Sequence, residues 1–169
     1  WRVSEADPLW RPAYIGIGSN LGSPVRQIET AIERVAGIAD TRLVAQSPLY
    51  RSAPFGGVEQ PDFVNGVLAI LTRLAPAELL TRLQQIERAA GREKGGVRWG
   101  PRELDLDLLV YSSVSFKSDD LVIPHPGIGE RNFVLLPLRD LAPDLIIPGL
   151  GRVSGIPVNG KEPAISRID

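Results

Sequence analysis

Two carboxylates two residues apart are the first candidates for chemistry. Asp105 and Asp107 alternate with leucines at positions 104, 106 and 108, and a period of two predicts a half-buried strand. Both carboxylates should then lie on one face, roughly 7 Å apart along the strand. Mg²⁺ suits such a pair, because it binds one or two carboxylates and takes its other ligands from water and phosphate. The same pattern is also compatible with the solvated face of an edge strand.

Basic residues precede this pair. Four of them, interspersed with glycines, occupy the segment before Asp105: Arg92, Lys94, Arg98 and Arg102. Guanidinium groups bind phosphate oxygens through paired hydrogen bonds, so we expect a polyphosphate to be shared between metal and arginines. The segment 92–98 is either a solvated surface loop or a glycine-hinged lid that closes over phosphates.

The composition excludes several kinds of site. The 169 residues have a net charge of -1, no Cys and a single His, His125. These totals exclude disulfides, thiol nucleophiles and histidine-rich metal sites, and they give no overall charge that would attract nucleic acid. We identify no membrane span and no signal peptide, and therefore expect a cytoplasmic protein. The absence of Met suggests that the sequence begins after a removed residue.

The hydrophobic pattern predicts an α+β fold. Apolar periodicity and capping residues give the order strand, helix, strand, strand, helix, strand, which is that of the ferredoxin-like βαββαβ fold with an antiparallel sheet. Strands are expected over 13–17, 41–51, 63–74 and 104–109, and helices from Pro24 to Gly37 and from Pro76 to Gly91. We also expect a flexible lead-in over 1–12, a single domain over 13–169, a hairpin or turn over 111–120, a helix over 134–141 and a tail that winds over the surface from Pro143 onward.

Individual polar residues leave alternatives open. Asn65 interrupts an apolar strand and needs hydrogen-bond partners, which are either neighbouring backbone groups or the edge of a ligand. His125 lies between two prolines and must be extended, with or without a functional role. The glycine-rich turn 18–22 lacks the Lys-Ser/Thr pair of a phosphate loop, and we interpret it as a tight turn between strand and helix.

Four blocks in unbroken order resemble the 6-hydroxymethyl-7,8-dihydropterin pyrophosphokinase family. They are AYIGIGSNLG (13–22), QPDFVN (60–65), RWGPR followed by LDLD (98–107), and the segment from PHP to RNF (124–133). The likeness covers roughly residues 13–148. It implies the ferredoxin-like fold and a Mg²⁺-dependent diphosphotransferase of folate biosynthesis, which transfers pyrophosphate from ATP to the hydroxymethyl oxygen of the pterin and releases AMP.

The resemblance also implies roles for individual residues. Asp105 and Asp107 would hold two Mg²⁺ ions, with Arg92 and Arg102 acting in catalysis beside them. Residues implied for ATP are Leu80, Gln84, Glu87, Lys94, Arg98, Trp99, Leu108, Leu121, His125 and Arg131. Residues implied for the pterin are Ser52, Ala53, Pro54, Phe55, Phe63, Asn65, Trp99 and Phe133, with Phe63 and Phe133 stacking on the ring. Lys94 stands where the family often has Arg, which removes the bidentate fork.

The implied partners are ATP and 6-hydroxymethyl-7,8-dihydropterin, and we expect a monomer that binds neither nucleic acid nor membrane. Two alternatives are a non-catalytic nucleotide- or RNA-binding module and one part of a bifunctional folate protein. RNA binders of this fold display aromatic residues and a basic face, whereas this chain is nearly neutral and has carboxylates on its fourth strand. The 169 residues leave no room for a second enzyme.

Overall fold

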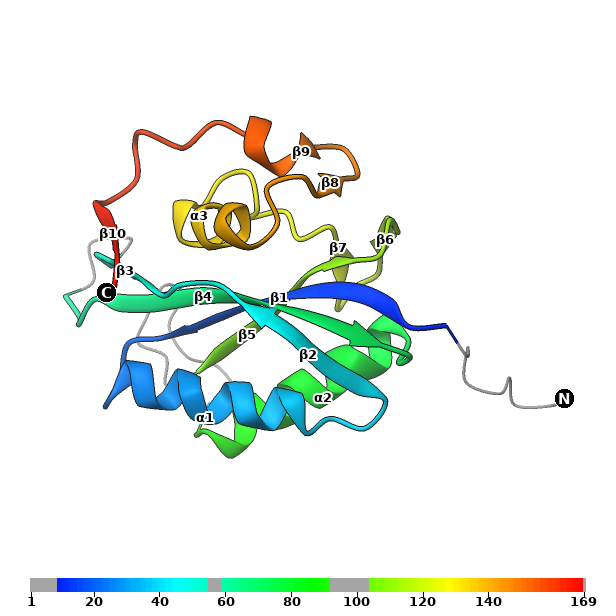
Figure 1. Ribbon diagram of the computed structural model, residues 1–169. Coiled ribbons are helices and arrows are strands. Elements are labelled where there is room, and N and C mark those ends of the chain that lie inside the picture. The colour runs from blue at the N-terminus through cyan, green and yellow to red at the C-terminus, as the bar shows by residue number, and fades with distance from the viewer. Residues whose placement is uncertain (1–8, 55–58, 92–103, 169) are drawn as a thin grey trace, which may run out of the picture.

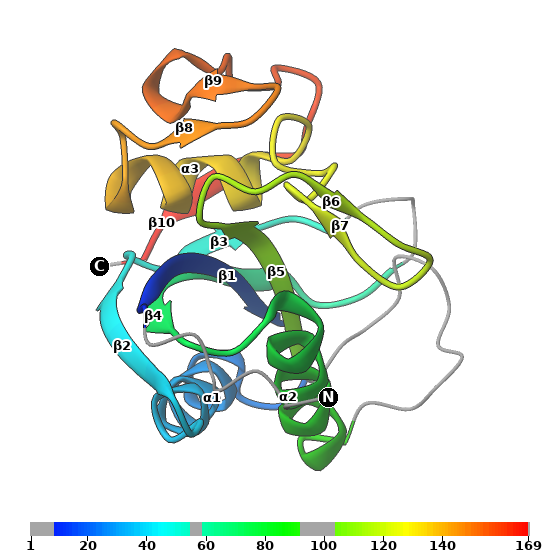
Figure 2. The same cartoon turned by 90° about the vertical axis from the view of Figure 1, so that its right-hand side faces the viewer.

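An antiparallel sheet separates two helices on one face from a third helix on the other (Figures 1 and 2). The computed structural model describes residues 9–54, 59–91 and 104–168. The helices are α1 (Pro24–Ala36), α2 (Pro76–Ala89) and α3 (Asn132–Leu141). The strands of the large sheet are β1 (Arg11–Ser19), β2 (Thr41–Gln46), β3 (Tyr50–Ser52), β4 (Phe63–Thr72), β5 (Asp105–Tyr111) and β10 (Ile165–Arg167).

The strand order confirms the predicted fold class. The sheet runs β10-β3-β4-β1-β5, and β2 pairs with β4 along the half that β3 leaves open. Strands β2, β4, β1 and β5, with α1 and α2 as the connections on one face, form the βαββαβ core. Helix α1 begins at Pro24 after Ser23, as expected, and α2 begins at Pro76. Within the part of the chain described, no helix is long and apolar enough to cross a membrane.

The expected second strand over 41–51 is two strands. β2 ends at Gln46 and β3 begins at Tyr50. The intervening Ser47 still donates its backbone N–H to the carbonyl of Val67 at 2.9 Å, but its Oγ, in place of a backbone carbonyl, accepts the N–H of Val67 at 2.9 Å. Pro48 has no N–H to donate to a ladder. A serine hydroxyl that replaces a backbone partner, followed by proline, therefore interrupts the strand.

The tail after Pro143 does not simply wind over the surface. It forms a small hairpin of β8 (Ile146–Ile147) and β9 (Gly151–Arg152) followed by the 3-10 helix η1 (Val153–Gly155). Ile147, Val153 and Ile156 are buried against α3, and β10 joins the large sheet. Short apolar pieces separated by glycine and proline carry no periodicity, so the sequence pattern does not reveal their burial.

Two hydrophobic cores occupy the two faces of the sheet. Beneath α1 and α2, the core includes Leu106 and Leu108 of β5. On the α3 face, it includes Val67, Leu109 and Leu135. The register between β1 and β5 shifts between Leu108 and Val110, and at this bulge the consecutive residues Leu109 and Val110 both enter the core on the α3 face. Before the bulge, strict alternation places Asp105 and Asp107 on the α3 face.

The chain enters the sheet earlier than expected. β1 begins at Arg11, inside the predicted lead-in, and Arg11 pairs with Thr72. Trp10 contacts two cations, with Arg42 4.3 Å and Arg73 5.5 Å from its ring centre. Cation–π contacts of this kind fix residues that directly precede the strand. Elsewhere, β6 (Phe116–Lys117) and β7 (Val122–Ile123) form a short hairpin, one of the two alternatives expected for residues 111–120, and it extends a few residues beyond them.

Candidate active site

Four neighbouring strands bring one row of residues together on the α3 face of the sheet. Tyr50 pairs with Asn65, Asn65 with Gly18, and Gly18 with Asp105. Residues paired across an antiparallel sheet point to the same face. With strands spaced ~4.8 Å apart, Asn65 and Asp105 lie about 10 Å apart across the row. Register therefore joins two candidate residues that are far apart in sequence.

Gly18 leaves space that the amide of Asn65 fills. A Cβ atom on Gly18 would lie 2.3 Å from Asn65 Nδ2, closer than any real contact. On the same side chain, Oδ1 is buried and has no hydrogen-bond partner among the described residues. A buried amide oxygen without a partner is costly. No described backbone group therefore satisfies the oxygen of Asn65.

The adjacent turn is held by a residue that the sequence analysis did not single out. Asn20 is buried, and its Nδ2 donates to Gln60 Oε1 at 2.9 Å and to the carbonyl of Pro61 at 3.0 Å. These bonds tie the glycine-rich turn after β1 to the segment that enters β4 at Phe63. The sequence does mark Asn20 as a candidate, since an Asn within a glycine-rich turn often bonds to backbone groups. It does not reveal the partners, which lie 40 and 41 residues away.

The two carboxylates lie on the exposed end of edge strand β5. Asp105 and Asp107 are half-buried and are paired with Gly18 and Gly16, which contribute no side chain beside them. No group of three or more His, Asp or Glu residues that could hold a metal occurs in the described chain. A cation here would have two protein carboxylates, and this is the donor set with which Mg²⁺ is commonly held alongside phosphate. The chemistry of the pair therefore fits magnesium.

The charge of Asp105, one of the two carboxylates, acts on His125. Its backbone N–H donates to the carbonyl of Leu109 at 2.8 Å, and its Nδ1 accepts the N–H of Gly127 at 3.0 Å. Burial lowers the pKa of His125 below 6.5, the charge of Arg131 lowers it further, and the charge of Asp105 opposes both. A neutral imidazole whose Nδ1 accepts must carry its proton on Nε2. His125, Arg131 and Asp105 thus form one electrostatic group.

The aromatic residues implied for the pterin lie on the same face. Phe63 pairs with Ser52 across β3 and β4, and it shares the face of Asn65 two residues further along. Phe133 is the second residue of α3 and packs partly against the core on that face. Ala53 and Pro54 continue from the end of β3 and are half-buried. The described residues Phe63, Asn65 and Phe133, all predicted to contact the pterin, thus lie on the α3 side of the sheet.

The residues implied for adenosine lie on the other face of β5. Leu108 and Leu121 are buried in the α1 and α2 core, with Leu80 packed against it, and Gln84 is exposed on α2. Glu87 is buried, and its Oε1 accepts the N–H of Leu106 at 2.7 Å. Because β5 is the edge strand, an ATP molecule that contacts these residues and also Asp105 and Asp107 on the opposite face must pass around that edge.

Six predicted site residues lie outside the described residues: Phe55, Arg92, Lys94, Arg98, Trp99 and Arg102. Their roles stay predictions.

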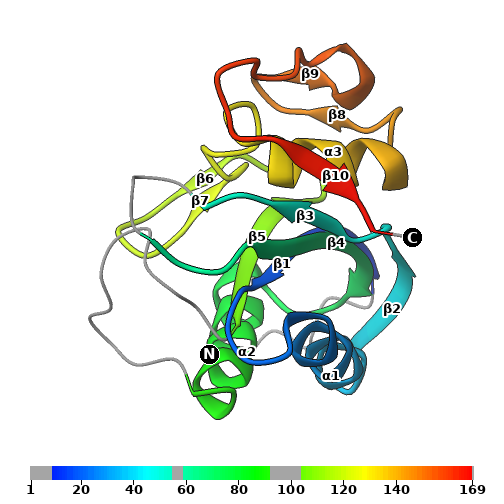
Figure 3. The ribbon, with the colours of Figure 1, turned by 90° about the vertical axis from the view of Figure 1, so that its left-hand side faces the viewer.

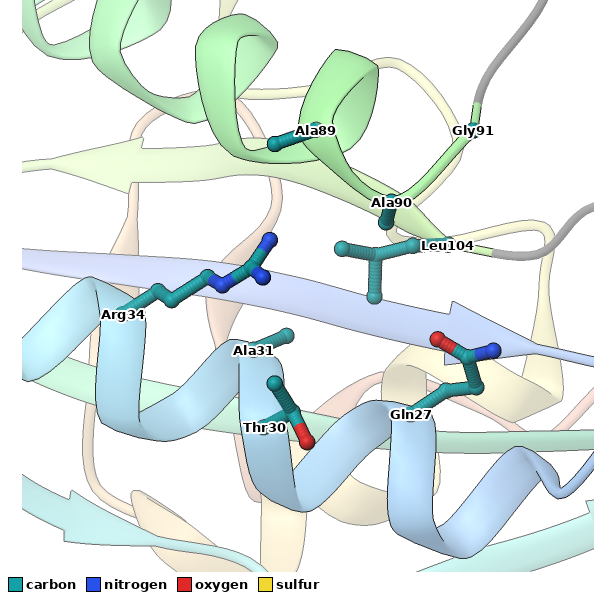
Figure 4. A pocket seen from close by; sticks show the side chains of 8 residues that line it. All are labelled: Gln27, Thr30, Ala31, Arg34, Ala89, Ala90, Gly91 and Leu104. Atoms are coloured by element: carbon teal, nitrogen blue, oxygen red, sulfur yellow. The ribbon is translucent and has the colours of Figure 1, made fainter.

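A hollow between α1 and α2 has a different character (Figure 4). Its volume is about 370 Å³, and its lining residues are Gln27, Thr30, Ala31, Arg34, Ala89, Ala90, Gly91 and Leu104. None of its lining residues carries a carboxylate, and it lies on the face of the sheet that α1 and α2 cover. It is therefore separate from the row that joins Asn65 to Asp105.

Comparisons with known proteins show to which family the chain is similar. A family model described as 7,8-dihydro-6-hydroxymethylpterin-pyrophosphokinase matches residues 14–143. A 2-amino-4-hydroxy-6-hydroxymethyldihydropteridine pyrophosphokinase of Pseudomonas aeruginosa is 50% identical over 135 residues, which are 80% of this chain and 83% of that one. The Haemophilus influenzae protein of the same name is 44% identical over 136 residues, covering 80% and 84% of the two chains.

Solved structures support the fold. The Plasmodium falciparum HPPK-DHPS wild type with pterin and p-hydroxybenzoate has a TM-score of 0.70 at 14% identity, over 90% of this chain and 43% of that one. The triple mutant S436F/A437G/A613S of that protein with SDX-DHP has a TM-score of 0.72 at 15% identity, over 90% and 42%. This chain thus spans less than half the length of these structural relatives. On the sequence matches, the chain belongs to the 7,8-dihydro-6-hydroxymethylpterin-pyrophosphokinase family.

Proposed function

We propose that the chain transfers the pyrophosphoryl group of ATP to the hydroxymethyl oxygen of 6-hydroxymethyl-7,8-dihydropterin. The oxygen attacks the β-phosphorus, the bond from that phosphorus to the α,β-bridging oxygen breaks, AMP leaves, and the hydroxyl proton is released. The family assignment supports this reaction. The observation that carries it is the row on the sheet, which aligns Asn65, Gly18 and Asp105.

The row contains one residue for each substrate, Asn65 for the pterin and Asp105 for the phosphates of ATP. The free Oδ1 and the Nδ2 of Asn65 can read the donor and acceptor groups on a heterocycle edge. Asp105 lies about 10 Å away across two strand spacings, and we expect it to hold the phosphates through a cation. A flat pterin between these residues would present its hydroxymethyl arm toward the carboxylate end. Positioning and charge neutralisation then account for most of the catalysis.

Asp105 and Asp107 are the residues that would hold Mg²⁺, and two ions are our expectation. Bound there, magnesium would neutralise phosphate charge and polarise the transferred group. The protein would contribute cationic Arg131 and a neutral His125 whose Nε2–H can donate to a phosphate oxygen. Arg92, Lys94, Arg98 and Arg102 are expected to add further phosphate contacts, and Trp99 to contact both substrates.

The aromatic residues support binding of a flat ring. Phe63 and Phe133 lie on the α3 face, and stacking on aromatic faces stabilises heteroaromatic ligands. We expect Leu80, Gln84, Leu108 and Leu121 near adenosine, at the other face of β5, and we expect Glu87 to contact ATP. A monomer, a cytoplasmic location and a single domain over residues 13–169 stay predictions.

The reaction is tested by product identity. ATP and Mg²⁺ are incubated with the protein, with and without 6-hydroxymethyl-7,8-dihydropterin, and nucleotides are separated. AMP that forms only with the pterin is the expected result. ADP as the product would contradict the proposal, because it requires transfer of the γ-phosphoryl group alone. Binding of ATP and pterin without turnover would favour the alternative of a non-catalytic binding module.

The pterin site is tested separately by Asn65→Asp. The substitution preserves the shape and the acceptor oxygen, but it replaces the amide donor by a second acceptor and adds a negative charge when the carboxyl is ionised. The dissociation constant of the pterin should rise by at least ~10-fold, the equivalent of about 1.4 kcal/mol, while that of ATP with Mg²⁺ stays within about twofold. Calorimetric titration of each ligand measures both. Equal weakening of both ligands would place Asn65 outside the pterin site.

A further inference from the structure

Residues 157–168 contact the start of α3 and then pair with β3, and we name them the C-terminal strap. They lie beyond residues 14–143, to which the family model matches. The strap leaves the buried Ile156, runs past the first turn of α3 and ends as β10 beside β3 (Figure 3). It therefore touches two elements that carry predicted substrate residues.

The first contact is a reciprocal pair of asparagines. Asn132 is buried at the start of α3. Its Nδ2 donates to the carbonyl of Asn159 at 2.8 Å, and its Oδ1 accepts the N–H of Asn159 at 2.9 Å. Asn159 Nδ2 also donates to the carbonyl of Glu130 at 3.1 Å. Asn132 lies between Arg131, which is predicted to bind ATP, and Phe133, which is predicted to bind the pterin. These hydrogen bonds therefore fix the backbone of both residues.

The second contact is a helix cap supplied from a distance. Helix α3 has Arg131 at its N-cap, no side-chain cap within the helix start, and no acidic residue in its first turn. Glu162 Oε2 accepts the N–H of Asn132 at 2.6 Å. The first N–H groups of a helix lack intrahelical partners, and a carboxylate is favourable at that end. Glu162 thus replaces the cap that the local sequence lacks.

The third contact is along β3. Ile165 pairs with Ser52 and Arg167 with Tyr50, and the carbonyl of Ala164 accepts the N–H of Ala53 at 3.4 Å. Without β10, β3 would be a three-residue edge strand with open hydrogen-bonding groups. The strap therefore holds Ser52 and Ala53 as well as the start of α3.

From these contacts we infer that the C-terminal strap positions the pterin site, by holding Ser52 and Ala53 on one side and Phe133 on the other. The inference rests on the proposed function. Glu162, Asn159 and Asn132 are positioning residues, because they act through the backbone of residues that would contact the substrate. Loss of the cap should loosen α3 at Phe133 and weaken pterin binding, while chemistry in the saturated complex proceeds at its normal rate.

Glu162→Ala tests the strap. Removal of a helix cap predicts a rise in the KM and Kd for the pterin of roughly 5- to 10-fold, with kcat within about twofold and a smaller change in the KM for ATP. Glu162→Gln retains an oxygen that can accept the Asn132 N–H and should restore most of the pterin affinity. Asp144→Ala is the matched control, because Asp144 is an exposed acid of the C-terminal region that pairs with Arg152.

A lower melting temperature of Glu162→Ala with an unchanged KM and Kd for the pterin would overturn the inference. So would equal loss of pterin affinity in Glu162→Gln and Glu162→Ala, because the retained acceptor would then be irrelevant. A second readout is independent of turnover. Amide hydrogen exchange at residues 132–135 should accelerate in Glu162→Ala compared with wild type, and unchanged exchange there contradicts positioning. Absence of pterin-dependent AMP from the wild type would instead reject the proposed function.

Discussion

The amide of Asn65 occupies the space in which Gly18, its partner across β1 and β4, would carry a side chain. A Cβ atom at Gly18 would meet Asn65 Nδ2 at 2.3 Å. The orientation of the amide thus depends on a glycine 47 positions earlier in the chain. Gly18 pairs with Asp105 on its other side. It therefore lies between Asn65, which is predicted to contact the pterin, and Asp105, which is predicted to bind metal.

Gly18→Ala is expected to displace Asn65 and reduce pterin affinity by at least ~10-fold. Overpacking of a tight site costs about 1–3 kcal/mol in folding free energy. Calorimetry with the pterin and urea denaturation measure the two effects. Gly16→Ala serves as the control, because its Cβ would meet Leu109 Cδ2 at 3.4 Å, an ordinary contact. Similar loss of pterin affinity in both variants would show that the clash with Asn65 is not the cause.

Asp105→Asn and Asp107→Asn should each reduce turnover by at least about 10²-fold, because preorganised charge at a transferring phosphoryl group is worth that much or more. The folded state should persist, since two neighbouring carboxylates repel each other without a cation. Rates over a range of Mg²⁺ concentrations and thermal melts in metal-free buffer test both statements. Asp119→Asn, at an exposed position between β6 and β7, is the control. Strong destabilisation of the two site variants in metal-free buffer would indicate a structural role instead.

His125 is the single histidine of the chain, so its titration can be followed by one imidazole resonance. Burial and the charge of Arg131 lower the pKa of His125 below 6.5, and the charge of Asp105 opposes them. In the interval just below pH 6.5, the folded state binds fewer protons than the unfolded chain, so stability should fall as the pH drops through it. In metal-free buffer, Arg131→Gln should raise the pKa and Asp105→Asn should lower it. Shifts in the opposite directions would contradict the proximity of the three side chains.

Glu162 has the opposite pH dependence. Burial raises the pKa of Glu162 above 4.5, although the N–H of Asn132 and the charge of Arg131 oppose the rise. The folded state therefore binds more protons than the unfolded chain just above pH 4.5, and stability from this group should decline as the pH rises through that interval. Glu162→Gln removes the titration and should flatten this part of the stability profile. Denaturant midpoints measured between pH 4 and pH 7 in both proteins provide the comparison, and identical profiles would exclude the effect.

Glu87→Ala should lower the free energy of unfolding by about 1–3 kcal/mol, because the buried N–H of Leu106 loses its acceptor. Glu87→Gln keeps an amide oxygen at that place and should lose less. Gln85→Ala on an exposed position of α2 should stay within about 0.5 kcal/mol of wild type. Chemical denaturation measures all three, and equal stability of Glu87→Ala and Gln85→Ala would mean that the bond contributes little.

Part of the fold and part of the site followed from local patterns. The alternation at 104–108 predicted that Asp105 and Asp107 share a face, because successive residues of a strand point to opposite sides. Pro24 and Pro76 marked helix starts for an equally local reason, since proline suits the first helical position. The family blocks led to the candidate residues and to the reaction, and they required no contacts between distant segments.

Register and long-range bonds came from the tertiary structure alone. That Asn65, Gly18 and Asp105 form one row depends on how three strands align, and a shift by one residue would move each side chain to the other face. The sequence likewise does not reveal that Glu87 is buried and accepts the N–H of Leu106, or that Glu162 caps a helix that begins 30 residues earlier. Hydrophobic periodicity describes which face of an element is buried, whereas pairing of segments far apart in the chain is decided only when the sheet and its two cores assemble.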